Sequence, residues 1–151
     1  MMKKFPPKQK ILEAFTAIAD NHVKVGDNEA TVTSSDEVKT YTVTFHDDVY
    51  TSNDNATYWQ GYAGYPVLAV LMLQGRLTTE KSLVNQFANV DWHAINKANK
   101  RKYDKAAEEV INERGLDEDT VNAAMDKDFA ELKALPLTIK RGSIRPPKAK
   151  K

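Results

Sequence analysis

The spacing of apolar residues changes along the chain from a helical period to a strand period. Apolar residues recur at helical spacing between residues 8 and 19, which predicts a first helix. Beyond this helix, apolar and polar residues alternate, as they do in strands with one buried face. Segments rich in Gly, Asn, Asp and Ser separate these stretches and suit turns between antiparallel neighbours. The strands are predicted at residues 23–25, 30–32, 41–45 and 49–52.

The second half of the chain returns to helical patterns. The stretch from Pro66 to Gly75 is apolar on nearly every side, which predicts a helix buried between the sheet and later helices. Leu137–Ile139 has room for one short strand. The chain is therefore predicted to be an α+β protein with a leading helix, an antiparallel meander of three to four strands, and about four helices packed on the sheet. The other three helices are predicted after Thr78 or Thr79 through Ala88, from Trp92 to Arg114, and from Asp117 to Pro136.

Length and composition favour one soluble globular domain. The chain has 151 residues, of which 41% are apolar and 28% charged, and it has no cysteine. Disulfides, thiolate zinc sites and cysteine nucleophiles are therefore excluded. The longest apolar run, Val67 to Leu73, is far shorter than the roughly 20 residues that span a bilayer. The amino terminus has no uninterrupted apolar run like that of a signal peptide, so we expect a cytoplasmic protein without membrane contact.

Charge divides the chain into an acidic body and a basic tail. Residues 1–139 are predicted to form the single domain, and residues 140–151 to form a flexible tail that contains no acidic residue. Unopposed lysine and arginine bind phosphate backbones by releasing counterions, so the tail is a candidate site for nucleic acid. The tail could equally contact an acidic patch on the body or on a second subunit of a homodimer. Its basic residues are Lys140, Arg141, Arg145, Lys148, Lys150 and Lys151.

Four of the 13 aromatic residues are concentrated between positions 58 and 65. Tyr58, Trp59, Tyr62 and Tyr65 are the candidate ligand-binding residues, because aromatic rings can line a site for a planar ligand, a sugar or a peptide. The alternative is that the same rings pack the sheet against the apolar helix. On either interpretation, Tyr58 and Tyr62 are expected to be exposed, since buried hydroxyls need partners, whereas Trp59 and Tyr65 are expected in the core.

A second candidate is the sequence His46-Asp47-Asp48, which places an imidazole beside two carboxylates. These groups could supply a general base or bind a hard metal ion. Adjacent residues on a strand point to opposite faces, so the three converge only where the chain turns. Since Asp-Asp is also ordinary turn chemistry, we predict a turn between two strands and keep an enzyme centred on these residues as the less favoured alternative.

The chain contains no established nucleotide, hydrolase or metal motif. We therefore predict no cofactor and no metal, and an enzyme is not favoured. Basic residues in the predicted helix from Trp92 to Arg114 loosely suggest a helix-turn-helix, but Asp104 and Glu108 lie on the same side of this helix, which favours a solvated face with ion pairs. These basic residues are Lys97, Lys100, Arg101, Lys102 and Lys105.

Two function hypotheses follow from these patterns. The leading hypothesis is a small cytosolic binding module without catalysis, whose recognition surface is centred on residues 58–65 and whose partner is a protein or a small molecule. The alternative is a nucleic-acid-associated accessory protein that uses residues 140–151, with the basic positions between Lys97 and Lys105 as a further contact. An enzyme centred on His46 is the third.

Overall fold

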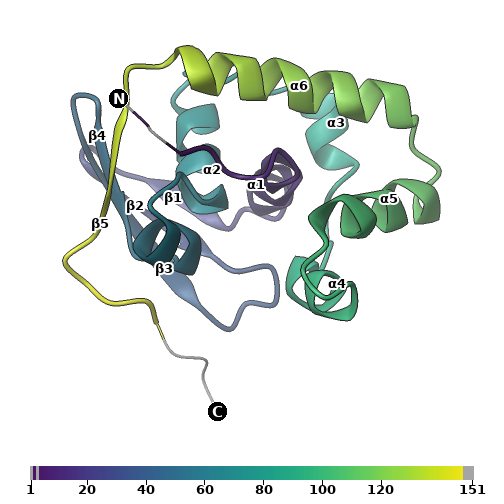
Figure 1. Ribbon diagram of the computed structural model, residues 1–151, viewed down its shortest axis with the longest axis horizontal. Coiled ribbons are helices and arrows are strands. Elements are labelled where there is room, and N and C mark those ends of the chain that lie inside the picture. Colours follow the sequence, from purple (N-terminus) through teal and green to yellow (C-terminus); the bar gives the residue numbers. More distant parts are fainter. Residues whose placement is uncertain (1, 3, 148–151) are drawn as a thin grey trace.

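The computed structural model describes residue 2 and residues 4–147, which adopt the α+β fold that the sequence predicts (Figure 1). Among these residues, no helix combines the length and the apolar character that crossing a membrane requires. In chain order the elements are α1 (Lys10–Ala19), β1 (Val23–Val25), β2 (Glu29–Thr33), β3 (Thr40–His46), β4 (Val49–Ser52), the π-helical turn η1 (Ala56–Gln60), α2 (Tyr65–Leu73), α3 (Lys81–Asn85), α4 (Trp92–Ala98), α5 (Tyr103–Glu113), α6 (Glu118–Ala134) and β5 (Thr138–Arg141).

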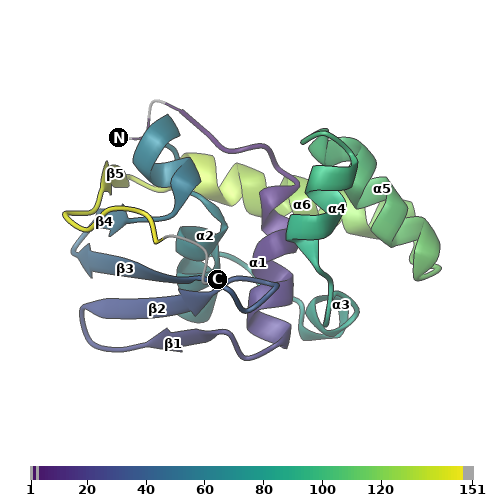
Figure 2. The same cartoon turned by 90° about the horizontal axis from the view of Figure 1, so that it is seen from below.

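The five strands form one sheet in the order β1-β2-β3-β4-β5. The first four are antiparallel, and the predicted meander is confirmed. Alternate residues of β2 and β3, such as Ala30, Val32 and Val43, are buried, as the period of two requires. The chain returns from α6 to place β5 parallel to β4, with Ser52 opposite Arg141 (Figure 2). The predicted last strand is therefore present, and it extends two residues into the predicted tail.

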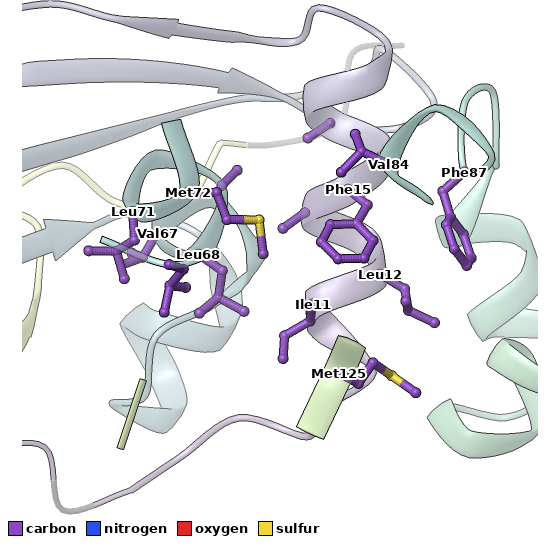
Figure 3. Packing of buried hydrophobic residues seen from close by; sticks show 14 of the residues in the cluster. Ile11, Leu12, Phe15, Val67, Leu68, Leu71, Met72, Val84, Phe87 and Met125 are labelled. Carbon is purple, nitrogen blue, oxygen red and sulfur yellow. The ribbon is translucent and has the colours of Figure 1, made fainter. Parts of the chain in front are cut away.

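Helix α2 lies between the sheet and α1, and this position explains its apolar sequence. In Figure 3, Leu68 and Met72 lie on the side of α2 that faces α1, whereas Val67 and Leu71 lie on the opposite side, toward the sheet. All residues from Pro66 to Met72 are buried. Leu73 was expected in the core with them, but this is wrong, because the last residue of the helix is exposed.

The far side of α1 is closed by the later helices. Phe15 of α1 packs against Phe87, which follows α3, with ring centroids 6.1 Å apart (Figure 3). Met125 of α6 lies beside the start of α1, near Ile11 and Leu12, in the same view. Helix α1 is thus surrounded by apolar residues from α2, α3 and α6, which makes it the central element of the core.

The long helix predicted from Trp92 to Arg114 is wrong. The structure has two helices, α4 and α5, separated at residues 99–102. Lys100 and Arg101 have φ angles of 53° and 63°, in the left-handed region that no α-helix can contain. The backbone N–H of Arg101 donates to the Asn96 carbonyl at 2.8 Å and closes the end of α4. The basic residues predicted to share one helix face therefore belong to two helices and the turn between them.

Helix α6 contains a buried acid, Asp128, which is 2% exposed. Burial, repulsion by the Glu131 carboxylate and a hydrogen bond to Glu131 raise the pKa of Asp128 to about 7. Glu131 is itself fixed by Thr78, whose backbone N–H and hydroxyl donate to its two oxygens at 2.8 and 2.6 Å. A protonated Asp128 can donate to Glu131, so the acid is stable in this site while it carries its proton.

Asp128 is expected to make the folded protein less stable as the pH rises from 4 to 8. Its pKa is about 7 in the folded state and close to 4 in the unfolded chain, so folding takes up a proton between these values. The stabilisation from this proton is complete below pH 4, decreases as the pH rises, and is lost once the pH has passed the folded pKa near 7. The free energy of unfolding changes by at most about 1.4 kcal/mol per pH unit in this range. Urea unfolding across this range should show a shallower slope for Asp128→Asn.

Asp126→Asn is the matched control, because Asp126 lies on the same helix with its side chain exposed. It should keep the pH dependence of the wild type. Equal slopes for wild type and Asp128→Asn would show that Asp128 is ionised throughout and would contradict the raised pKa.

Candidate functional site

A polar cavity of about 370 Å³ lies between α1, the β2–β3 turn and the two helices α4 and α5. Figure 2 shows the β2–β3 turn next to α1, with α4 on the other side. The chain segment that leads into η1 forms a further wall. Each part of the wall contributes at least one polar side chain: Glu13 of α1, Asp36 of the β2–β3 turn, Asp54 before η1, Asn96 of α4 and Arg101 of the α4–α5 turn.

A buried ion pair contributes to the wall of the cavity. Lys10 Nζ lies 3.2 Å from Glu13 Oε2, and the two side chains are only 12% and 7% exposed. Burial raises the pKa of Glu13, and the attraction of Lys10 offsets only part of this effect. Burial disfavours the charged Lys10, but Glu13 and Tyr103 outweigh it and raise the pKa of the lysine. The Lys10 ammonium also lies 4.2 Å from the centroid of the Tyr103 ring, so a side chain of α5 contacts the ion pair through a cation–π interaction.

A second buried carboxylate, Asp54, belongs to the wall next to η1. It accepts hydrogen bonds from the Ser52 hydroxyl and from the backbone N–H of Thr57, the latter at 3.1 Å. Burial raises its pKa against the effect of these bonds. Gly64 leaves the space for this carboxylate, because a Cβ atom there would lie 2.1 Å from Asp54 Oδ2. The residue at position 64 is therefore set by the close approach of a side chain.

Several polar atoms around the cavity have no partner within the described part of the chain. Asn96 Nδ2 donates to Glu13 Oε2 at 3.5 Å, which leaves the buried Asn96 Oδ1 without a donor. The hydroxyls of Tyr41 and Tyr65, whose rings meet edge to face at 6.3 Å, also make no hydrogen bond to the described residues, but they are not among the enclosed atoms that lack a partner. Buried polar groups are usually paired, so Asn96 Oδ1 is the enclosed polar atom of this wall that lacks a donor.

Formal charges around the cavity cancel. The lining contains three basic and three acidic side chains, together with His93 at the edge. No group of three acidic, histidine or cysteine side chains in the described residues has the geometry to hold a metal ion. The cavity is thus suited to a molecule without net charge that both donates and accepts hydrogen bonds. The six charged residues are Lys10, Lys39, Arg101, Glu13, Asp36 and Asp54.

The structure separates the four aromatic candidates. Tyr65 lines the cavity from the start of α2, while Tyr62 is half-buried outside its lining. Tyr58 and Trp59 lie on η1, away from the cavity. The expectation that Trp59 belongs to the core is wrong, because it is 64% exposed. The π-helical turn buries Thr57 instead, and this orientation leaves the indole outside.

Asp47 and Asp48 form the turn between β3 and β4 that the sequence predicts, and His46 is the last residue of β3. Asp47 has a φ of 52°, and its side chain and that of His46 are exposed. Asp48 accepts a hydrogen bond from Arg76 Nη2 at 2.7 Å. The three side chains do not converge on one point, so the structure explains them as turn residues.

The basic residues near the carboxyl end divide into two groups. Lys140 and Arg141 belong to β5, and Arg145 follows it with an exposed side chain and a backbone carbonyl that accepts from Asn53 Nδ2 at 3.3 Å. The three remaining candidates lie outside the described residues. They are Lys148, Lys150 and Lys151.

A model of the family described as Uncharacterised conserved protein UCP014422 matches residues 3–138. The chain belongs to this family. No curated protein and no solved structure matches the chain. The matched region contains every residue that lines the cavity, and it ends before Lys140 and Arg141.

Most cavity residues were missed by the sequence reasoning. Glu13 offers one local signal, since a charged residue stands among the buried positions 11–17 of an amphipathic helix with a lysine three residues before it. Asp54 and Asn96 offer none, because polar residues are ordinary in a loop and on a short helix. Only the tertiary structure brings these three side chains together.

Proposed function

We propose that the protein binds a small polar molecule without net charge in the cavity next to the Lys10–Glu13 ion pair. The observation that carries this proposal is the buried Asn96 Oδ1, which has no donor within the described residues although its amide nitrogen is held by Glu13. Leaving a buried acceptor unpaired costs about 1 to 3 kcal/mol, and a ligand that donates to it recovers this energy.

The chemistry of the walls narrows the class of ligand. Hydroxyl groups both donate and accept, so Tyr41 and Tyr65 can pair with the hydroxyls of a sugar, a polyol or a nucleoside. The balanced charges of the lining give no excess attraction for a phosphate or for a free amine. A cavity of about 370 Å³ is within the usual range for small-molecule sites.

The leading hypothesis of a binding module is kept, but the binding site is placed in the cavity and not on the surface of residues 58–65. The recognition site includes Tyr65 from the aromatic segment, but its other polar groups come from α1, the β2–β3 turn, β3, the loop before η1, α4 and the α4–α5 turn. Catalysis is not needed to explain these groups, because Asp54 is occupied by hydrogen bonds from Ser52 and Thr57.

A thermal-shift screen tests the proposal. Neutral sugars, polyols and nucleosides are screened beside their phosphorylated forms against the wild type, Asn96→Leu and Tyr65→Phe. A neutral compound present at about 100 times its Kd should stabilise the wild type by roughly 2.7 kcal/mol, which corresponds to an increase in Tm of about 5 to 10 °C. The two variants should lose most of this increase.

His46→Ala is the matched control, because its exposed side chain lies at the end of β3 remote from the cavity. It should respond to the compound as the wild type does. Stabilisation that is undiminished in Asn96→Leu and Tyr65→Phe, or that only phosphorylated compounds produce, would contradict a neutral-ligand site in this cavity.

A further inference from the structure

The most exposed large apolar side chain among the described residues is Trp59. It stands on η1 beside Tyr58, whose ring meets the indole nearly edge-on with centroids 4.7 Å apart. This contact limits the orientations of the indole while most of the side chain stays exposed to solvent. π-helical turns of this kind are rare and often occur at functional sites.

The guanidinium of Arg141, on β5, lies next to the rings of Tyr58 and Trp59. Strand β5 runs beside η1 (Figure 2). Arg141 Cζ therefore lies 4.5 Å from the Tyr58 centroid and 5.9 Å from the Trp59 centroid. Within the described residues, no carboxylate forms an ion pair with Arg141. Its guanidinium packs on Tyr58 while its N–H groups keep the capacity to bind an anion.

The segment after β5 is fixed next to η1 by backbone contacts. The Gly142 N–H donates to the Ser52 carbonyl at 3.0 Å, and Asn53 Nδ2 donates to the Arg145 carbonyl at 3.3 Å. Lys140, Arg141 and Arg145 all have exposed side chains. No acidic residue occurs in residues 55–79 or 138–147, so η1, β5 and the segment after β5 contribute aromatic and basic side chains but no acidic one.

We infer that Tyr58, Trp59 and Arg141 form a binding surface for single-stranded nucleic acid. An open indole accepts an unstacked base of any sequence, and an arginine beside it neutralises the adjoining phosphate. In a duplex the bases are already stacked and cannot reach the ring. Among the described residues of η1, β5 and the segment after β5, Ile144 is the only other exposed large apolar side chain, and two such side chains are too little apolar surface for insertion into a membrane. This surface is separate from the cavity, and the inference does not depend on the proposed function.

Fluorescence anisotropy with labelled oligothymidylate of about 12 nucleotides tests the inference on the full chain. Trp59→Ala should weaken binding about 5- to 100-fold by removal of one stacked base. Arg141→Gln should reduce the slope of log affinity against log salt by about 0.7, the value for one phosphate on a single strand. Both side chains are exposed, so the variants should fold, and a Tm measurement checks this.

Intrinsic fluorescence adds a readout that is specific to the site. The chain has two tryptophans, and Trp92 is buried with its Nε1 donating to Thr16. The oligonucleotide should therefore quench the wild type and leave Trp59→Phe almost unquenched. Lys24→Gln is the matched control for charge, since Lys24 is exposed on β1 at the opposite edge of the sheet. Its affinity should equal that of the wild type.

Four results would overturn the inference. They are the absence of saturable binding at low salt, duplex DNA bound as tightly as the single strand, affinity unchanged in both Trp59→Ala and Arg141→Gln, and binding of phosphatidylserine vesicles without binding of the oligonucleotide. The last result would instead identify a membrane-binding surface.

Discussion

Lys10→Met is expected to lower the free energy of unfolding by about 3 to 5 kcal/mol at pH 8, because it leaves Glu13 buried without its counter-ion. The methionine keeps most of the apolar volume of the lysine stem, so the loss reports the ion pair more than the packing. Both partners are nearly enclosed, and the remaining hydrogen bond to Glu13 comes from Asn96 at 3.5 Å. A long bond from a neutral amide cannot replace an ammonium group.

The loss should depend on pH in a direction that follows from the pKa of Glu13. Burial already raises this pKa, and removal of Lys10 raises it further, so the folded variant takes up a proton that the unfolded chain binds only near pH 4. The penalty is therefore complete above the folded pKa and decreases as the pH falls below it. Urea unfolding at pH 5 and pH 8 measures this difference.

Two further variants make this result specific. Lys10→Met combined with Glu13→Gln should recover a large part of the stability at pH 8, since neither partner of the pair then carries a charge. Lys8→Met is the matched control, because Lys8 pairs with Asp126 at 2.8 Å on the surface and should contribute less than about 1 kcal/mol. If Lys10→Met were as mild as Lys8→Met at pH 8, Glu13 would already be uncharged in the wild type.

The sheet and the core were predictable because their signals are local. Apolar and polar residues alternate along residues 23–52 because one face of each strand is buried. This pattern is the same whichever strand is the neighbour, so it can be recognised in the sequence alone. The apolar stretch from Pro66 to Met72 has the same property, since a helix without a polar side has to be enclosed. The break between α4 and α5 could not be predicted, because no glycine or proline occurs at residues 99–102.

The candidate site was predictable only in part because its chemistry is assembled over long range. Glu13 and Asn96 are separated by 83 residues, and each has an ordinary local explanation. For Trp59 a local signal exists, but the prediction of burial that it supports is wrong. Its large apolar ring without a hydroxyl predicts burial, but the direction of a side chain on a short π-helical turn depends on where Thr57 is buried. Tyr65 was expected in the core, but at the first residue of α2 it is only partly buried and packs against the core from outside.

Leu71→Ala is expected to lower the free energy of unfolding by about 2 to 5 kcal/mol, through loss of apolar transfer energy and the cavity left between α2 and the sheet. The side chain is 0% exposed and belongs to the central cluster of buried residues (Figure 3). Leu73→Ala provides the control on the same helix, because Leu73 is 48% exposed and its truncation should cost less than about 1 kcal/mol. Chemical denaturation followed by circular dichroism compares the two. Since both substitutions have the same helix propensity and remove the same atoms, any difference between them measures enclosure alone, and equal losses would show that α2 is not packed between the sheet and α1.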